Sequence, residues 1–273
     1  MMNATTIPIL MYHHVSPSPG LVTLSPKTFT QQMTWLANSG WKTLSVHELE
    51  QFYQGKPFPR KSVIITFDDG YLDNWVYAFP VLERLQLKAS IFLITKDIGN
   101  GQARKLSNIE YSHRKCEAKI RNGQADDVML RWSEIEHMQA SELIEFHNHT
   151  HSHLRWDQLE TNIERRHAAL IKDIEQCRNT LIQQLGYCSQ HLCWPQGFYT
   201  RDYAKIAKEL GFNYLYTTER RVNKACQPET WRLGRISTKE REDTQWLKRR
   251  LFYYTTPVIS SLYAFIKDPD ILN

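Results

Sequence analysis

Short apolar runs alternate with amphipathic segments along most of this 273-residue chain. The clearest run spans 62–67, and continuous apolar character over so few residues is typical of a strand buried on both faces. Strand followed by helix followed by strand implies parallel pairing. The alternation therefore predicts an α/β fold, with one barrel-like domain over 1–273. Its core is expected at about 7–236, followed by a basic and aromatic extension at about 237–273. Further strands are predicted at 7–12, 89–94, 143–146, 191–194, 212–216 and 231–236.

Helix signals lie between these runs. Apolar residues recur at helical spacing from Leu159 to Leu185, which predicts one long helix ending before Gly186. Residues 97–128 are polar and poorly periodic, and we expect them to leave the core and form a wall of a cleft. Shorter helices are predicted at 25–39, 77–85, 132–138 and 203–210.

Charge and cysteine content exclude several classes of protein. The net charge of +5 is too small and too scattered to indicate nucleic-acid binding. The five cysteines are odd in number and form no C-x-x-C pair, so neither a disulfide framework nor a cysteine zinc site is expected. The first fifteen residues do not resemble a signal peptide, and no stretch approaches the length of a membrane span. These features predict a cytoplasmic protein.

Polar residues follow three of the predicted strands at the point where each strand ends. Asp68 and Asp69 follow the run at 62–67, four histidines lie within 146–153, and Pro195-Gln196-Gly197 follows 191–194. The carboxyl ends of parallel strands converge on one face of a sheet or barrel, where sites are built. We therefore expect the acidic pair and the histidine cluster to meet.

Two imidazoles and one carboxylate suit zinc or another divalent transition metal with open positions for water and substrate. The pairs His149/His153 and His147/His151 both have a spacing of four residues. Spacing alone leaves the choice between them open.

The segments ITFDDGY (65–71) and NHTHSH (148–153) resemble the first two motifs of the polysaccharide deacetylases, the carbohydrate esterase family 4 or NodB-homology domain. This resemblance extends from the first predicted strand to about Ile236. It implies a distorted (β/α) barrel in which Asp69, His149 and His153 bind one divalent metal ion. Zn²⁺ is expected first, and Co²⁺ or Ni²⁺ as alternatives. It also implies that Asp68 is the catalytic base.

The third family motif, Arg-Pro-Pro-Tyr-Gly, is similar here to the segment 193–197, which reads Cys-Trp-Pro-Gln-Gly. The resemblance implies that the backbone N–H of Gln196 faces an oxyanion. It also places Trp194, Pro195 and Tyr71 among the residues expected to contact the substrate. The family arginine is absent, so the sequence does not show what orients Asp68. A Trp-Pro-x-Gly segment resembles the branch that acts on poly-N-acetylglucosamine.

That branch supplies its catalytic acid from an early Tyr-His motif, which Met11-Tyr12-His13-His14-Val15 resembles. His13 is therefore the expected acid, and His14 is the alternative because neighbouring strand residues point in opposite directions. His147 and His151 are expected to pack near the ligands and to hold one of the ligand imidazoles. We assign structural roles to the remaining histidines, which are His47, His113, His137, His167 and His191.

These observations predict a metal-dependent hydrolase that removes N-acetyl groups from N-acetylhexosamine residues. The expected substrate is a surface glycan or its lipid-linked precursor, as in lipopolysaccharide or exopolysaccharide assembly. Two alternatives stay open: hydrolysis of a small cyclic amide, and a non-catalytic glycan-binding module. The basic cluster that begins at Lys239 is either a solvated helix face or a surface that meets anionic lipid or a lipid-linked glycan at the inner membrane.

Overall fold

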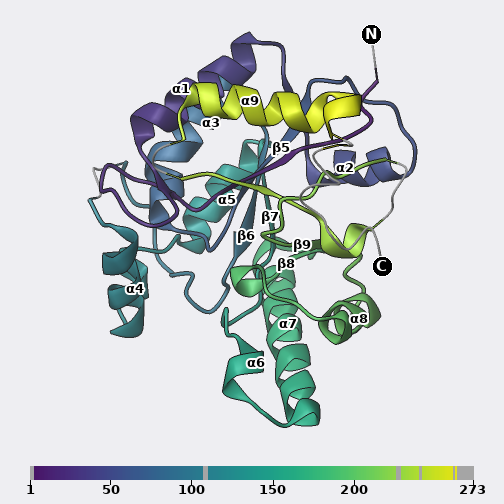
Figure 1. Cartoon of the computed structure of the whole chain (residues 1–273). Coiled ribbons are helices and arrows are strands. Elements are labelled where there is room, and N and C mark those ends of the chain that lie inside the picture. The colour runs from purple at the N-terminus through teal and green to yellow at the C-terminus, as the bar shows by residue number, and fades with distance from the viewer. Residues whose placement is uncertain (1–2, 107–109, 226–228, 240–241, 261, 263–273) are drawn as a thin grey trace.

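The computed structural model describes residues 3–106, 110–225, 229–239, 242–260 and 262. Its main sheet is parallel throughout and curls into an open, distorted barrel (Figure 1), as predicted. Along the sheet the strand order is β10-β1-β5-β6-β7-β8-β9, and β4 pairs with β5 at the end where β5 begins. The strands of this sheet are β1 (Ile9–Tyr12), β4 (Lys42–Thr43), β5 (Ser62–Phe67), β6 (Ala89–Leu93), β7 (Ile144–Asn148), β8 (His191–Cys193), β9 (Tyr214–Tyr216) and β10 (Ile236–Ser237). A separate short pair joins β2 (His14–Val15) to β3 (Thr23–Leu24).

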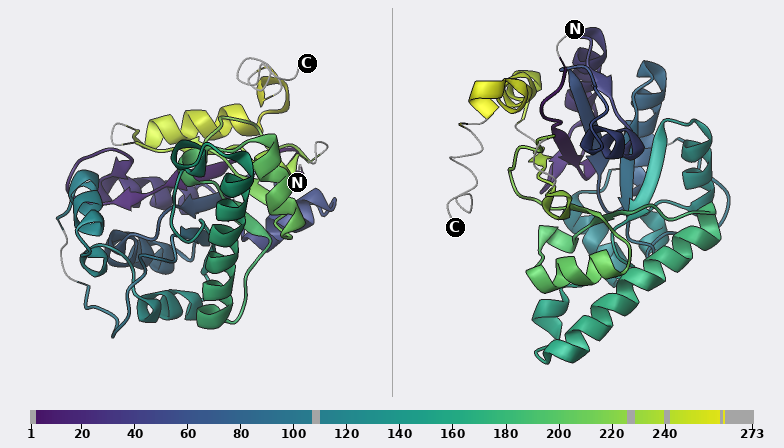
Figure 2. Two further views of the ribbon diagram at one scale, coloured as in Figure 1. Left: turned by 90° about the horizontal axis from the view of Figure 1, so that it is seen from below. Right: turned by 90° about the vertical axis from the view of Figure 1, so that its right-hand side faces the viewer.

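The helices cover the outside of the sheet (Figure 2). Helix α1 packs against both α3 and α9, whereas α7 lies against β7 and α8. The α-helices are α1 (Pro26–Asn38), α2 (Val46–Tyr53), α3 (Phe79–Leu85), α4 (His113–Arg121), α5 (Trp132–Ala140), α6 (Trp156–Leu159), α7 (Ile163–Leu185), α8 (Arg201–Glu209) and α9 (Thr244–Thr255). In the described part of the chain, none of the helices is both long and apolar enough to cross a membrane.

Two sequence predictions differ from this structure. The helix expected over 159–185 is divided, because Asn162 caps the start of α7 and separates it from the short α6. The strand expected over 231–236 is a 3₁₀ turn at Thr230–Arg232, a single bridge at Leu233 and then β10. In both cases a polar residue or a glycine interrupts an apolar pattern that otherwise reads as continuous.

Strand register positions the polar ends of the strands. Tyr12 pairs with Phe67, so His13 and Asp68 are the next residues of two neighbouring parallel strands. Leu93 of β6 pairs with Asn148 of β7, and the histidine loop begins directly after this pair. All six residues of β5 are buried, which confirms the reading of 62–67 as a strand covered on both faces. The carboxyl ends of β1, β5 and β7 therefore meet at one end of the barrel.

Candidate active site

The acidic pair lies in a strained turn at the end of β5. Asp69 has φ +75°, in the left-handed region that few residues other than glycine adopt. Gly70 follows with φ +87°, and a Cβ there would lie 2.8 Å from the Leu93 side chain. Backbone strain of this kind persists where the surroundings hold it, commonly at functional sites. The turn directs the carboxylates of Asp68 and Asp69 into the end of the barrel, where both are nearly fully buried.

The histidine loop after β7 is fixed by its own hydrogen bonds and by α7. The Asn148 side-chain oxygen accepts from the Thr150 N–H, and the Thr150 hydroxyl accepts from the His153 N–H. The buried Asp173 carboxylate of α7 accepts from the Ser152 N–H at 2.8 Å. Thr150 and His153 both have positive φ values, 63° and 56°. These contacts hold the imidazole of His153 near that of His149.

Asp69, His149 and His153 place three donor atoms around one point. His149 Nε2 lies 3.3 Å from Asp69 Oδ1, and His153 Nε2 lies 3.6 Å from the same oxygen. Tetrahedral zinc has ligand bonds of about 2.0–2.1 Å, so its ligand atoms lie roughly 3.3 Å apart. The buried Asp69 Oδ1 accepts no hydrogen bond from the described residues. The spacing and this unpaired oxygen both fit a divalent cation.

Protonation states support the same reading. The His149 Nδ1–H donates to the Cys193 carbonyl at 2.8 Å, so Nε2 is the ring nitrogen that faces Asp69. Although burial opposes it, Cys193 and Asp69 raise the pKa of His149 well above its usual range, so this point favours positive charge, and a proton and a cation would compete for Nε2. Burial lowers the pKa of His153 to about 4, so this imidazole is neutral and able to bind a metal.

Asp68 lies beside this triangle and is held by a buried arginine that no sequence motif indicated. Arg235, just before β10, donates from Nη1 to Asp68 Oδ1 at 2.7 Å and from Nη2 to Oδ2 at 2.8 Å. Both side chains are almost fully buried. Burial alone would raise the pKa of Asp68, but the charges of Arg235, His149 and His13 hold it below its usual range. Arg235 thus keeps Asp68 ionised and fixes its plane.

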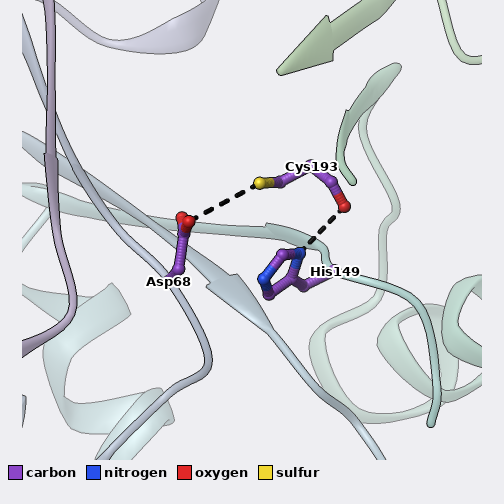
Figure 3. Close-up of side chains that lie close together, drawn as sticks. All are labelled: Asp68, His149 and Cys193. Carbon is purple, nitrogen blue, oxygen red and sulfur yellow. Dashed lines mark hydrogen bonds between the residues drawn. The ribbon is translucent and has the colours of Figure 1, made fainter. Parts of the chain in front are cut away.

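Cys193 occupies the position of the absent motif arginine and contacts the same carboxylate (Figure 3). Its thiol lies 3.7 Å from Asp68 Oδ2, and Arg235 Nη2 lies 3.1 Å from Sγ. Asp68, His149 and Cys193 together form a second group with metal-ligand spacing. Arg235 already neutralises Asp68, and the His149 Nδ1–H is bonded to the Cys193 carbonyl. This second group is therefore a poorer cation site than the Asp69 triangle.

His13 lines the cleft next to Asp68, with its Nε2 3.8 Å from Asp68 Oδ2. Burial lowers the pKa of His13, while the carboxylates of Asp68 and Asp69 oppose this shift. The position of His13 beside Asp68 and in the cleft suits a catalytic acid, and this role stays a prediction. His14 points the other way, with its Nδ1 2.6 Å from Asp73 Oδ2, and it is not among the residues that line the cleft.

Gln196 and Gly197 form part of the cleft wall. Gln196 has φ 55° and Gly197 has φ +71°. The Gln196 side-chain oxygen accepts from Arg155 Nη1 at 3.3 Å. A Cβ on Gly197 would lie 2.3 Å from the Thr218 hydroxyl, so this turn requires glycine. The oxyanion role of the Gln196 N–H stays a prediction.

Of the three expected substrate contacts, Tyr71 lines the cleft, whereas Trp194 and Pro195 do not. Trp194 and Pro195 are buried and do not line the cleft, because the Trp194 ring packs against Tyr203 of α8. Tyr71 does line the cleft, but its hydroxyl donates to Glu117 at 3.0 Å and its ring stacks on His14. Tyr71 thus supports the wall of the cleft.

His147 and His151 hold neither ligand imidazole, in contrast to the sequence expectation. His147 faces the barrel interior and pairs with the Ser189 hydroxyl at 2.7 Å. His151 pairs with the Thr95 hydroxyl at 3.0 Å. Instead, the backbone carbonyl of Cys193 accepts from His149 Nδ1 and holds this imidazole. A sequence does not reveal a backbone contact of this kind.

A cleft of about 690 Å³ is lined by His13, Asp68, Asp69, His149 and His153. Helix α4, from the segment expected to form a wall, contributes His113, Glu117 and Ile120 to its lining, while Arg220 and Lys239 lie in the lining as well. His113, assigned a structural role from sequence, therefore reaches the site. A cleft of this size lies within the range of about 300–1,000 Å³ that is typical of small-molecule sites.

A sequence model of the polysaccharide deacetylase family matches residues 55–215, which include both acidic residues and the histidine loop. The chain is 31% identical over 214 residues to YxkH of Bacillus subtilis (strain 168), a polysaccharide deacetylase by name, with 78% of this chain and 64% of the relative covered. It is 24% identical over 203 residues to the poly-beta-1,6-N-acetyl-D-glucosamine N-deacetylase of Staphylococcus aureus (strain N315), with 73% and 62% covered. The chain thus matches a little under two thirds of the length of these relatives.

Two solved structures share the fold. The Streptococcus pyogenes deacetylase PplD, in complex with acetate, has a TM-score of 0.73 at 22% identity, covering 91% of this chain and 99% of that one. IcaB from Ammonifex degensii has a TM-score of 0.72 at 23% identity, covering 90% and 97%. The resemblance seen in the two sequence motifs is confirmed, and the chain belongs to the polysaccharide deacetylase family.

Proposed function

We propose that this chain is a metal-dependent N-deacetylase that hydrolyses the acetamido groups of N-acetylhexosamine residues in a glycan. The observation that carries the proposal is the cation-sized triangle of Asp69, His149 and His153 with the arginine-clamped carboxylate of Asp68 beside it. The name of the Staphylococcus aureus relative favours poly-N-acetylglucosamine as the substrate. Zn²⁺ fits the ligand types best, with Co²⁺ or Ni²⁺ as alternatives.

A divalent cation held by the triangle would polarise the acetyl carbonyl and lower the pKa of water in the site. Asp68, ionised and fixed by Arg235, accepts the proton of the attacking water, and general base help is typically worth about 10²–10⁴-fold. The Gln196 N–H stabilises the oxyanion. His13, once protonated, donates to the departing sugar nitrogen. The products are acetate and a sugar with a free amine.

The alternatives lead to different results. A cyclic amidase on this scaffold would open a small ring without releasing acetate. A glycan-binding module would bind oligosaccharide without turnover. The complete triangle and the clamp on Asp68 favour catalysis over binding alone.

We also propose that the face formed by α1 and α9 contacts an anionic bilayer, where a lipid-linked glycan precursor of lipopolysaccharide or exopolysaccharide would be presented. A hollow of about 580 Å³ there is lined by Trp35, Trp41 and Phe252, with Lys61 and Lys248 among its lining residues. Aromatic side chains flanked by lysines suit a bilayer surface. The variants Lys248→Glu and Phe252→Ser should weaken sedimentation with anionic vesicles and leave acetate release from soluble oligomers unchanged. Equal sedimentation of both variants and the parent chain would contradict this surface.

A cytoplasmic location remains a sequence prediction. Cys116, Cys177, Cys188 and Cys193 are unpaired, which fits a reducing compartment, while Cys226 lies outside the described residues.

The test of the proposed function is acetate release from N-acetylglucosamine oligomers, measured together with freed amines. We expect equal amounts of both products, loss of both with a chelator, and recovery when Zn²⁺ is added back. Ring opening of a cyclic amide, or oligomer binding without acetate, would instead support one of the alternatives.

A further inference from the structure

A chain of three side chains runs from the barrel wall to the cleft and has no part in the proposed chemistry. His14 Nδ1 lies 2.6 Å from Asp73 Oδ2, and His14 Nε2 lies 3.1 Å from His113 Nδ1. The side chain of His14 is fully buried, and that of Asp73 is 6% exposed. His113, the first residue of α4, lines the cleft.

The hydrogen bonds of Asp73 fix which atoms donate and which accept along this series of side chains. Asp73 Oδ1 accepts from the Val15 N–H at 3.3 Å and from Asn74 Nδ2 at 3.0 Å. Its other oxygen faces His14, and an ionised carboxylate can only accept. His14 therefore carries its proton on Nδ1 and presents a lone pair at Nε2 when it is neutral.

This tautomer determines the next one. Because His14 Nε2 accepts, His113 must donate from Nδ1, and neutral imidazole has only one N–H. His113 Nε2 consequently carries a lone pair. Burial and the neighbouring His14 lower the pKa of His113, which favours the neutral form. Within the described part of the chain, no hydrogen bond to His113 Nε2 is formed.

The surroundings hold His113 in place. The Tyr71 ring stacks on His14 with centroids 3.7 Å apart, and the Tyr71 hydroxyl donates to Glu117, one turn along α4 from His113. The start of α4 is thus tied to β2 and to the turn that carries the acidic pair. An acceptor this well oriented suits one hydrogen-bond donor of a ligand in the cleft.

We propose that His113 binds the glycan, with Nε2 accepting from a hydroxyl or amide N–H of a sugar unit, and that Asp73 acts through His14 as a positioning residue that makes it an acceptor. This inference rests on the proposed function and names a specificity contact within the same cleft. The contact recognises the sugar and leaves the reacting acetyl group to the metal centre.

The experiment compares an N-acetylglucosamine oligomer with a small aryl acetate that has no sugar. His113→Ala should raise KM for the oligomer by about three- to tenfold, the worth of one neutral hydrogen bond. It should leave kcat for the oligomer and both constants for the aryl acetate within about twofold of the parent chain. Lys115→Ala, an exposed site on the same helix, is the matched control and should change none of these values.

Asp73→Asn tests the direction of the hydrogen bonds that run from Asp73 through His14 to His113, with the His113 side chain intact. The Val15 N–H and Asn74 Nδ2 still need an acceptor, so they bond to the side-chain oxygen of the new amide. The amide nitrogen then faces His14 and donates to it. His14 Nε2 and then His113 Nε2 become donors, and the donor on the sugar meets another donor. We expect the oligomer KM to rise at least as much as in His113→Ala, with an unchanged aryl acetate rate. Thermal unfolding of each variant checks folding, and His113→Ala alone decides the matter if Asp73→Asn does not fold.

Several results would overturn the inference. These are an unchanged oligomer KM in His113→Ala, an equal loss on both substrates, or an unchanged KM in a folded Asp73→Asn. If the parent chain releases no acetate, the proposed function fails by itself. Calorimetric binding of the oligomer to the parent chain and to His113→Ala then tests the contact separately.

Discussion

Replacing Arg235 with Met removes the charge that compensates Asp68 while keeping most of the buried volume. Asp68 would lose two hydrogen bonds of 2.7 and 2.8 Å, and the Thr217 carbonyl would lose its 2.9 Å bond from Arg235 Nε. Removing one partner of a buried pair leaves an uncompensated charge and costs about 3–5 kcal/mol. We therefore expect Arg235→Met to lower the free energy of unfolding by about that amount, measured by urea denaturation at pH 7.

A double-mutant cycle with Asp68→Asn isolates the pair. Once Asp68 is neutral, the loss of Arg235 no longer strands a charge. The double variant should therefore be more stable than the sum of the two single effects predicts, by about 1.5–3 kcal/mol. Additivity within about 0.5 kcal/mol, or a cost of less than about 1 kcal/mol for Arg235→Met alone, would refute the reasoning.

Three further predictions concern the expected acid His13, the turn at Gly197 and the buried His191. His13→Ala should lower kcat on N-acetylated glycans by about 10²–10⁴-fold and spare activated acetyl esters, whose leaving group needs no proton; equal losses in parallel kinetics would contradict the acid role. Gly197→Ala should cost about 1–3 kcal/mol in thermal unfolding, because its φ is +71° and a Cβ would overlap Thr218; an unchanged melting temperature would refute this. Burial lowers the pKa of His191 from 6.5 to about 4, so the unfolded chain takes up this proton first as pH falls. The His191 contribution is fully present above pH 6.5 and should fall by about 3 kcal/mol as pH drops from 6.5 to 4. His191→Gln should weaken this pH dependence in urea titrations, and the same slope in both proteins would count against it.

The positions of the acidic pair and the histidine loop were predictable, because each follows an apolar strand directly. A buried parallel strand has a strong local signal, and the carboxyl ends of such strands share one end of the fold. The register of Tyr12 with Phe67 then places His13 beside Asp68. The cation triangle needed only the two motifs and this topology.

The clamp on Asp68 was not predictable from local patterns. Arg235 lies 167 positions from Asp68 along the chain and precedes a strand of only two residues. A charged residue within the apolar segment that runs from Leu233 to Ile236 was the only signal. Trp194 was misassigned because its motif suggests the cleft, whereas its ring packs against α8. Tertiary packing decided both cases.

The role of His113 shows the same limit. Helix α4 is short and rich in charged residues, so its sequence does not show which face meets the cleft. The contact with His14 joins positions 99 residues apart, and the tautomer follows only from the complete set of Asp73 hydrogen bonds. Such a series of hydrogen-bonded side chains is visible only in three dimensions.

The most direct test of the cation triangle is metal content measured together with acetate release in Asp68→Asn and Asp69→Ala. We predict that Asp68→Asn retains about one equivalent of divalent metal and loses turnover, while Asp69→Ala loses both. Metal retained by Asp69→Ala, or near-normal acetate release by Asp68→Asn, would contradict the assignment of one carboxylate to the metal and the other to the water.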